Sequence, residues 1–203
     1  MNDSAADVQC TNVMHRSIKA LGQVTFVGTA VVCALALALA EGNVKPRMVN
    51  LDAFEVMGIE ARTNNAAEAG PNGLIPKLWQ RVTQPHALDG IPDRLDQNIY
   101  AVYTDYASDA NGDYTLVLGA KVRSGTKTPA GIAVKSVPSG RYAVFTSDVG
   151  PVTTVVVETW KQIWSYYQSP VNGQRGYRVD FEVYDQRAAD PKHAQVDIYI
   201  GVK

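Results

Sequence analysis

The stretch Phe181-Glu182-Val183-Tyr184 has a counterpart in the first half of the chain, Tyr100-Ala101-Val102-Tyr103. Two further pairs keep nearly the same spacing: Trp79 with Trp160, and Gly119 with Gly201. The members of each pair are 81 or 82 residues apart, and we call this spacing the repeat offset. A repeat that occurs only twice at this length is not a solenoid, which needs several shorter units to bury a continuous core. The repeat offset therefore predicts two similar modules, related by a pseudo-twofold axis, with a cleft between them.

Hydrophobic periodicity gives the first module the order strand, helix, strand, strand. The expected strands cover residues 53–62, 98–107 and 113–122, and a turn signal, Asp109 to Gly112, joins the last two. The helix presents four apolar residues on one face: Ile75, Leu78, Trp79 and Val82. This module occupies about residues 49–123.

The second module, at about residues 130–203, repeats the same order. Its strands are expected at residues 141–146, 178–185 and 194–203, with a connecting strand at 130–137. Its helix follows Pro151 and has this apolar stripe: Val152, Val156, Trp160, Ile163 and Tyr167. The predicted fold class is α+β: two tandem strand-helix-strand-strand modules related by a pseudo-twofold, forming one mainly antiparallel sheet with two packed helices.

Composition limits the function classes. The chain has 203 residues, of which 46% are hydrophobic, and a formal net charge of -1. This length is sufficient for one well-buried domain of ordinary composition. The near-neutral charge argues against a nucleic-acid-binding surface, which is normally rich in clustered Lys and Arg. We therefore expect no nucleic-acid partner.

The segment from Met1 to Ala40 has the composition of an export signal. A basic stretch at residues 14–19 precedes an apolar stretch at 20–40 that ends in small residues. We expect a signal peptide removed after Ala40, and hence a periplasmic or secreted protein. The alternatives are an uncleaved membrane anchor, since the stretch is long enough to span a bilayer, and lipidation at Cys33, against which the preceding Val32 argues. Met14 is an alternative start.

Both cysteines, Cys10 and Cys33, lie within this leader. A mature domain at residues 41–203 would contain no thiol, which excludes cysteine nucleophiles, thiolate metal sites and disulfides.

Four segments resemble one known family: Ser139 to Thr146, Trp160 to Trp164, Tyr177 to Asp185, and Val196 to Val202. This is the GyrI-like small-molecule-binding family, also called the AraC-type bacterial transcription activator effector-binding domain. The resemblance covers roughly residues 49–203, including the duplicated topology. No single motif carries it, but the order and spacing over this length are fairly specific.

The resemblance implies that bulky, often cationic and lipophilic compounds bind in a cleft between the modules. Members of that family are the sensor halves of transcription regulators or stand-alone proteins, and some stand-alone members are implicated in hydrolysing reactive cyclopropanoid toxins. The characteristic pocket acid of the family lies on the penultimate strand, where this sequence has Glu182. We expect no helix-turn-helix segment ahead of the domain, and the export signal argues against a transcriptional role.

The repeat singles out Glu182 independently, because its counterpart is Ala101. On a strand, Glu182 shares a face with Tyr184, whereas Phe181 and Val183 point to the other face and match core-like residues in the first copy. A partly desolvated carboxylate among aromatic rings would attract a lipophilic cation. The alternative is a surface glutamate on an exposed strand face.

Aromatic residues complete the predicted ligand-binding set. Tyr103 and Tyr184 occur in both copies, and we expect them to flank the cleft with their hydroxyls bound to water or ligand; an ordinary buried pair is the alternative. Three aromatics occur in only one copy and line the pocket or fill local packing gaps: Trp164, Tyr142 and Tyr199. Trp79 and Trp160 are expected in the core, because both lie in apolar stripes.

Other catalytic chemistry has little support in the sequence. His86 and His193 are far apart in loop-like segments, so we expect surface histidines, no metal site and no Ser-His-Asp triad. We expect no cofactor. Should the protein be an enzyme, the candidate water-activating carboxylates are Asp180, Glu182 and Asp197, with Glu182 as general base.

Three functional hypotheses follow. The first is an exported stand-alone protein that sequesters or senses cationic or lipophilic toxic compounds. The second is a metal-free hydrolase of reactive, cyclopropanoid-type toxins. The third is a ligand-switched effector module that acts through a protein partner. Contact with a membrane is expected only through an uncleaved leader.

Overall fold

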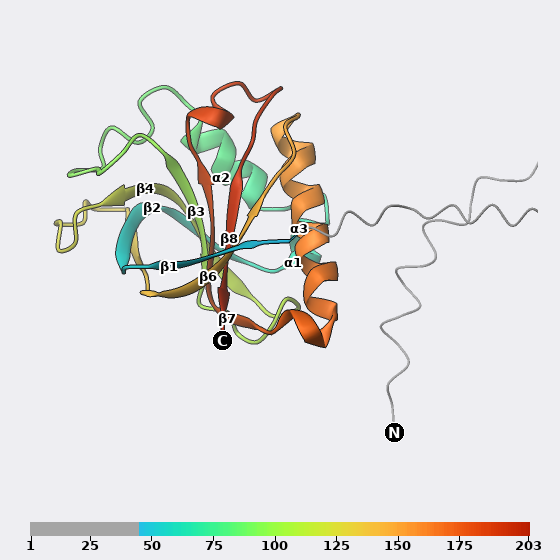
Figure 1. Cartoon of the computed structure of the whole chain (residues 1–203). Coiled ribbons are helices and arrows are strands. Elements are labelled where there is room, and N and C mark those ends of the chain that lie inside the picture. Colours follow the sequence, from blue (N-terminus) through green and yellow to red (C-terminus); the bar gives the residue numbers. More distant parts are fainter. Residues whose placement is uncertain (1–44) are drawn as a thin grey trace, which may run out of the picture. The chain divides into compact units, whose positions relative to one another are not determined.

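Eight strands, each antiparallel to its neighbours, form one sheet in the computed structural model of the protein, which describes residues 45–203 (Figure 1). The strands are β1 Arg47–Leu51, β2 Phe54–Thr63, β3 Ile99–Thr104, β4 Tyr114–Val122, β5 Ala133–Val137, β6 Gly140–Thr146, β7 Arg175–Tyr184 and β8 Asp197–Val202. The helices are α1 Asn65–Glu68, α2 Ile75–Val82 and α3 Val152–Gln168, with 3-10 turns at Pro170–Asn172 and Gln186–Ala188.

The leader predicted at residues 1–40 lies outside the described residues. From residue 45 to residue 203, no helix is both long and apolar enough to cross a membrane.

The strand order reflects the internal duplication. One half of the sheet runs β3-β4-β2-β5 and the other runs β7-β8-β6-β1, with β3 and β7 adjacent at the centre. Each strand of the first half thus has an equivalent in the second, and the predicted α+β class with an antiparallel sheet is confirmed. The sequence patterns do not predict β1. This strand pairs with β6 at one edge of the sheet, where it is the spatial equivalent of β5 on β2.

The register of β3 against β7 locates the pseudo-twofold axis. Tyr100 pairs with Val183, Val102 pairs with Phe181, and Ala101 pairs with Glu182. Ala101 and Glu182 are repeat counterparts, and a residue that faces its own counterpart must lie next to the symmetry axis. The axis therefore passes between Ala101 and Glu182, at the centre of the sheet.

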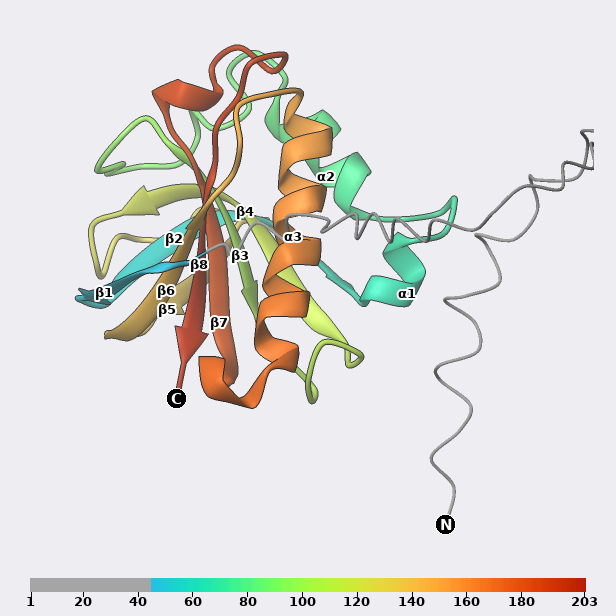
Figure 2. The same cartoon turned by 45° about the vertical axis from the view of Figure 1, so that its right-hand side comes forward.

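Both longer helices cover the same face of the sheet (Figure 2). One row of paired residues crosses this face from β2 to β6: Ile59, Leu118, Ala101, Glu182, Ile198 and Phe145. At one end of the row, Leu78 and Val82 of α2 pack on Leu118, and at the other end Ile163 of α3 packs on Phe145. Glu182 thus lies between two apolar clusters.

Local sequence signals place both helices. Pro76 lies in the first turn of α2, where its missing N–H is no loss, and two backbone amides at the start of this helix donate to the Glu68 carboxylate. α3 follows Pro151, and its buried side chains are Val155, Thr159 and Ile163. The valine-rich start of α3 is helical because burial of its inner face outweighs its low intrinsic helix propensity.

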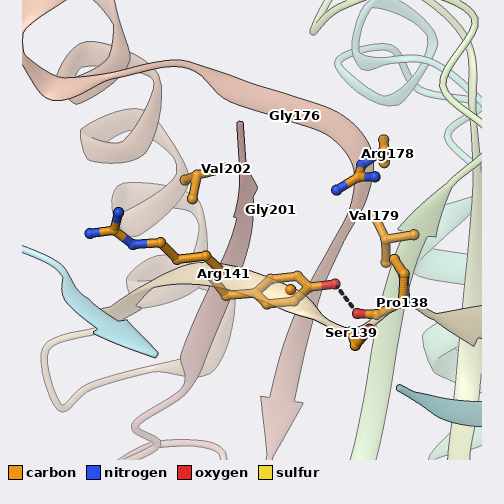
Figure 3. A pocket seen from close by; sticks show the side chains of 10 residues that line it. Pro138, Ser139, Arg141, Gly176, Arg178, Val179, Gly201 and Val202 are labelled. Carbon is orange, nitrogen blue, oxygen red and sulfur yellow. Dashed lines mark hydrogen bonds between the residues drawn. The ribbon is translucent and has the colours of Figure 1, made fainter. Parts of the chain in front are cut away.

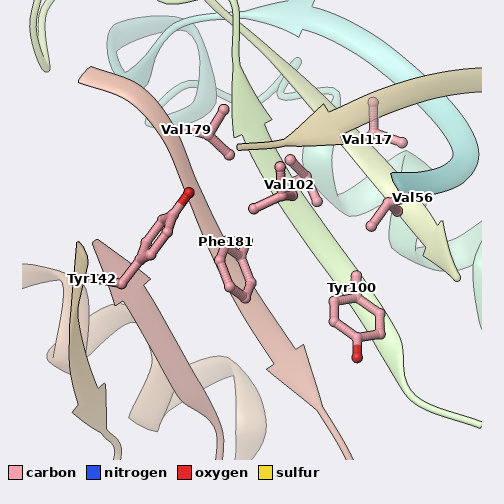
Figure 4. Packing of buried hydrophobic residues seen from close by; sticks show 8 residues of the cluster. Val56, Tyr100, Val102, Val117, Tyr142, Val179 and Phe181 are labelled. Atoms are coloured by element: carbon pink, nitrogen blue, oxygen red, sulfur yellow. The ribbon is translucent and has the colours of Figure 1, made fainter. Parts of the chain in front are cut away.

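The opposite face of the sheet is rolled around a second core (Figure 4). Phe54 on β2 and Phe181 on β7 are separated by two intervening strands, yet their ring centroids lie 5.4 Å apart. Pro138 and Ser139 alone join β5 to β6, although these strands belong to different halves of the sheet. The roll brings these distant strands together and buries this face without a covering helix.

The repeated glycines lie where strands approach closely. A Cβ atom on Gly119 would lie 1.8 Å from the carbonyl oxygen of Met57, and one on Gly201 would lie 2.7 Å from that of Val179. Neither position has room for a side chain without moving the neighbouring backbone. This explains why the pair matches between the two copies.

Candidate functional site

Glu182 lies near the C-terminal end of β7, a central strand of the sheet, and only 1% of its surface is exposed. Three neutral groups donate hydrogen bonds to its carboxylate. Tyr103 Oη and Trp160 Nε1 donate to Oε1, at 2.9 and 2.6 Å, and Tyr184 Oη donates to Oε2 at 2.6 Å. None of the ion pairs found within residues 45–203 includes this carboxylate.

Burial decides the protonation behaviour of this cluster. Loss of hydration raises the pKa of Glu182 above its ordinary value, and the hydrogen bonds from Tyr184, Trp160 and Tyr103 act in the opposite direction. Burial and the adjacent Glu182 charge also raise the pKa values of Tyr103 and Tyr184 well above the usual range. Both tyrosines therefore stay protonated and remain hydrogen-bond donors.

Two aromatic pairs, which we call the walls, flank the carboxylate. Each includes a tyrosine that donates to Glu182, and each contains one residue from either repeat. Trp79 of α2 packs on Tyr184 of β7, with ring centroids 4.5 Å apart and planes at 63°. Trp160 of α3 packs on Tyr103 of β3, at 5.3 Å and 71°. All four residues are half-buried. We call Glu182 and these four residues the axial site, because they surround the pseudo-twofold axis.

Trp164 extends the aromatic surface along α3. Its ring lies 6.2 Å from that of Trp160, and 39% of its surface is exposed. It lies one helical turn from Trp160, at the outer end of one wall. The structure thus brings four predicted ligand-binding residues together: Glu182, Tyr103, Tyr184 and Trp164.

A second buried carboxylate, Asp180, lies on the same face of β7 as Glu182. It accepts hydrogen bonds from Arg175 Nη2 at 2.6 Å, Tyr106 Oη at 2.7 Å and the Gly201 amide at 2.9 Å. The register shift in β7 between Arg175 and Asp180 brings the guanidinium of Arg175 to the carboxylate of Asp180.

Aromatic rings flank the cation of this pair. The Arg175 guanidinium carbon lies 4.5 Å from the Tyr177 ring centroid and 5.6 Å from that of Trp160. Its Nε is buried without a hydrogen-bond partner among the described residues. We call Arg175, Asp180, Tyr106 and Tyr177 the ion-pair region. Trp160 contacts both regions, because its N–H group binds Glu182 while its ring faces Arg175.

Tyr142 and Tyr199 do not join the axial site, which corrects the grouping predicted from the sequence. Both belong to the core on the opposite face, where Tyr199 stacks on Phe181 at 4.4 Å and Tyr142 meets the edge of the same ring at 5.5 Å. Phe181 precedes Glu182, so its side chain points away from the axial site. The Tyr142 hydroxyl donates to the Pro138 carbonyl.

The three carboxylates suggested as a water-activating set are also separated. Asp197 pairs with Val183, on the face opposite to Glu182, and binds Thr146 and Arg187. Asp180 is neutralised by Arg175. The set is therefore not assembled as one site.

His86 and His193 are exposed, as the sequence predicts. His86 contacts Asp89, and His193 contacts Asp190. Within residues 45–203 no group of three or more His, Cys, Asp or Glu side chains is placed to hold a metal ion.

Two hollows in the described surface lie away from Glu182. The smaller one, of about 10 Å³, lies beside Tyr142 and is lined by Pro138, Arg178 and Gly201 among others (Figure 3). The larger one, of about 380 Å³, lies beside α1 and is lined by Arg62, Asn64, Leu74 and Asp113 among others. Neither hollow lies at the axial site, where the sequence predicted a cleft between the modules. There the rings pair within each wall, Trp79 with Tyr184 and Trp160 with Tyr103.

Trp79 and Trp160 pack against the apolar clusters beneath α2 and α3, as expected, but the sequence did not predict that they also line the axial site. Trp160 donates to Glu182 and Trp79 packs on Tyr184, so both line the axial site. The signal was present in the repeat, since both copies have Trp at the equivalent position of the helix.

Comparisons with known proteins agree with this architecture. The family model for Cass2, the integron-associated effector binding protein, matches residues 47–202. The putative transcriptional regulator YobU of Bacillus subtilis is 36% identical over 158 residues, which are 77% of this chain and 96% of YobU. The transcriptional regulator BrlR of Pseudomonas aeruginosa is 31% identical over 163 residues, but the match covers only 56% of BrlR.

Solved structures show the same fold. An integron cassette protein from the mobile metagenome of Vibrio cholerae superimposes with a TM-score of 0.62 at 27% identity, covering 78% of this chain and 96% of that one. The protein SAV2435 bound to tetraphenylphosphonium superimposes with a TM-score of 0.60 at 18% identity, covering 78% and 94%. The match over residues 47–202 and the likeness to YobU show that the chain belongs to the Cass2 family of integron-associated effector-binding proteins, which have the GyrI-like effector-binding fold.

Proposed function

We propose that this protein binds lipophilic organic cations at the axial site. The observation that carries the proposal is the Glu182 carboxylate, which is buried beside two aromatic pairs and has only neutral hydrogen-bond donors. An ionised carboxylate without a cationic partner is costly to bury. A bound cation would supply that partner, and contact with the ring faces would add about 0.5–2 kcal/mol of attraction.

The side chains around Glu182 must move to admit such a ligand, because only 1% of the surface of Glu182 is exposed. The partial exposure of the aromatic rings gives a hydrophobic cation a surface on which to bind first. Displacement of the rings would then bring the charge to the carboxylate. Tetraphenylphosphonium, the ligand of the SAV2435 structure, has the chemistry that this arrangement favours.

Titration calorimetry on the full chain tests the proposal, with tetraphenylphosphonium as the cation and triphenylphosphine oxide as a neutral probe of similar shape. We expect Glu182→Gln to weaken cation binding at least about tenfold and to leave binding of the neutral probe unchanged. Tyr142→Phe is the matched control, because it removes one hydroxyl from the opposite face. Unchanged cation affinity in Glu182→Gln would overturn the assignment of the site.

We also propose that the protein is exported and stands alone as a sequestering or sensing protein. This rests on the basic and apolar composition of residues 14–40. Fractionation of the native host, with N-terminal sequencing of the recovered protein, tests it. A mature N-terminus near residue 41 outside the cytoplasm is expected, whereas an intact leader in the membrane fraction would indicate an anchor, and an intact chain in the cytoplasm would contradict export.

The hydrolase hypothesis receives less support from the side chains. All three donors of the axial site point at Glu182, and neither Asp180 nor Asp197 is free to assist it. Binding without turnover is the function that this geometry favours.

A further inference from the structure

The axial site has a symmetry that its proposed function does not require. The pseudo-twofold axis passes beside Glu182, and the repeat offset exchanges Trp79 with Trp160 and Tyr103 with Tyr184. It therefore exchanges one aromatic wall with the other. The two walls have similar ring geometry, with interplanar angles of 63° and 71°. An aromatic surface is thus available on both sides of a central charge.

The hydrogen bonds follow the same symmetry. Tyr103 donates to Oε1 and Tyr184 donates to Oε2, so each tyrosine binds a different oxygen of the one carboxylate. The negative charge therefore lies between the walls and belongs to neither of them. Because Glu182 has no acidic counterpart in the first repeat, the site has one negative charge at the axis and an equivalent aromatic surface on each side of it.

The walls differ in one respect that makes them experimentally separable. Trp160 Nε1 donates to Glu182, whereas Trp79 packs on the ring of Tyr184 and is not one of the three donors. Substitution of Trp79 therefore removes the tryptophan ring of one wall and leaves all three hydrogen bonds to the carboxylate in place.

We propose that the preferred ligands are monocations whose charge lies between two equivalent aromatic arms. This inference rests on the proposed function and specifies its ligand class. In such a ligand the charge sits over Glu182 while each arm contacts one wall. A cation with a single aromatic arm satisfies the charge but leaves one wall without a partner.

Two quaternary ammonium probes with the same charge and the same number of carbon atoms test this preference. Dibenzyldimethylammonium has two aromatic arms, and benzylheptyldimethylammonium has one aromatic and one alkyl arm. We expect the full chain to bind the two-armed probe about tenfold more tightly, as one additional cation–π and ring contact would give. We expect Trp79→Leu to abolish this preference.

The one-armed probe provides the sharper control. It can place its single ring against either wall, so loss of the Trp79 ring disfavours one of two equivalent poses and costs at most about twofold. Trp79→Leu should therefore weaken the two-armed probe about tenfold and the one-armed probe at most about twofold. Should Trp79→Leu fail to fold, as shown by circular dichroism, Trp79→Thr and Trp79→Met make the same comparison.

The outcomes separate this inference from the proposed function. Equal affinity of the wild-type chain for both probes, with equal losses in the Trp79 variant, would overturn the two-armed preference and leave cation binding intact. Failure of both probes and of tetraphenylphosphonium to bind would overturn the proposed function as well.

Discussion

Two carboxylates on β7, those of Asp180 and Glu182, are buried on the same face of the sheet but have different partners. Asp180, in the ion-pair region, binds the Arg175 guanidinium, which aromatic rings flank. Glu182, in the axial site, has a comparable aromatic surrounding but only neutral donors. Within the described residues, Asp180 is thus paired with a cation, whereas Glu182 has no cationic partner. The first shows the arrangement that the proposed cationic ligand would create at the second.

The largest expected effect comes from breaking the ion pair itself. Arg175→Met leaves the Asp180 carboxylate buried and without its cation, so we expect the free energy of unfolding to fall by about 3–5 kcal/mol. Chemical denaturation measures this loss. Arg178→Met is the control, because Arg178 lies on the same strand but is exposed, and its replacement should change stability by less than about 0.5 kcal/mol. Equal losses in both variants would contradict a special role for the buried pair.

The next effect in size comes from Trp160, which contacts both regions. Trp160→Phe keeps an aromatic ring but removes the N–H group that donates to Glu182, so we expect a loss of about 1.5–3 kcal/mol in unfolding free energy. The pKa of Glu182 should rise further, because one of three donors that stabilise the ionised form is lost.

Trp79→Phe makes the matched comparison, since Trp79 packs on Tyr184 and does not belong to the three donors that bind Glu182. It should leave the pKa of Glu182 unchanged. The Glu182 carboxyl titration, followed by isotope-edited NMR, distinguishes the two variants, and an equal shift in both would show that the indole N–H has no specific role.

A smaller effect, of opposite sign, is expected when the unpaired charge is removed. The folded-state pKa of Glu182 is raised above its unfolded value, so this group favours folding fully below the unfolded pKa, and that contribution is lost as the pH rises through the folded-state pKa. Glu182→Gln should therefore be more stable than the wild type at neutral pH, with a difference that disappears below about pH 4. Chemical denaturation of both proteins across this pH range measures the difference.

The same titration should govern binding, because only the ionised carboxylate attracts a cation. Wild-type affinity for tetraphenylphosphonium should fall as the pH drops through the folded-state pKa of Glu182, whereas the Gln variant should show no such dependence. A wild-type affinity that is constant over this range would argue that another group binds the cation.

The contrast between the two regions also shows which parts of the structure the sequence predicts. The repeat offset and the hydrophobic periods predict the duplicated sheet and both long helices, because burial of apolar faces determines them. The sequence also places Glu182 and Tyr184 on one face of the sheet, because side chains alternate between the two faces along a strand. The same alternation does not predict which face Arg175 lies on, because the register shift in β7 interrupts it between Arg175 and Asp180.

Contacts between distant elements were less predictable. Tyr199 lies opposite Phe181 only because of the pairing of β7 with β8, and a pattern within one strand does not specify that register. Trp160 lies on the inner face of α3, as its periodicity indicates, but periodicity does not show that this face meets a carboxylate on another element. β1 escaped prediction because its partner, β6, belongs to the other module and is distant in the sequence.

The smallest expected effect concerns the outer limit of the axial site. Trp164 is partly exposed and lies beside Trp160, so Trp164→Ala should change the free energy of unfolding by less than about 0.5 kcal/mol. A cation that extends past Trp160 would lose one exposed ring contact, which corresponds to a decrease in affinity of about two- to fivefold. Val157→Ala, another exposed apolar position on α3, should leave affinity unchanged. Equal effects of the two substitutions on tetraphenylphosphonium binding would place the edge of the site at Trp160, and a loss specific to Trp164 would extend the aromatic wall by one helical turn.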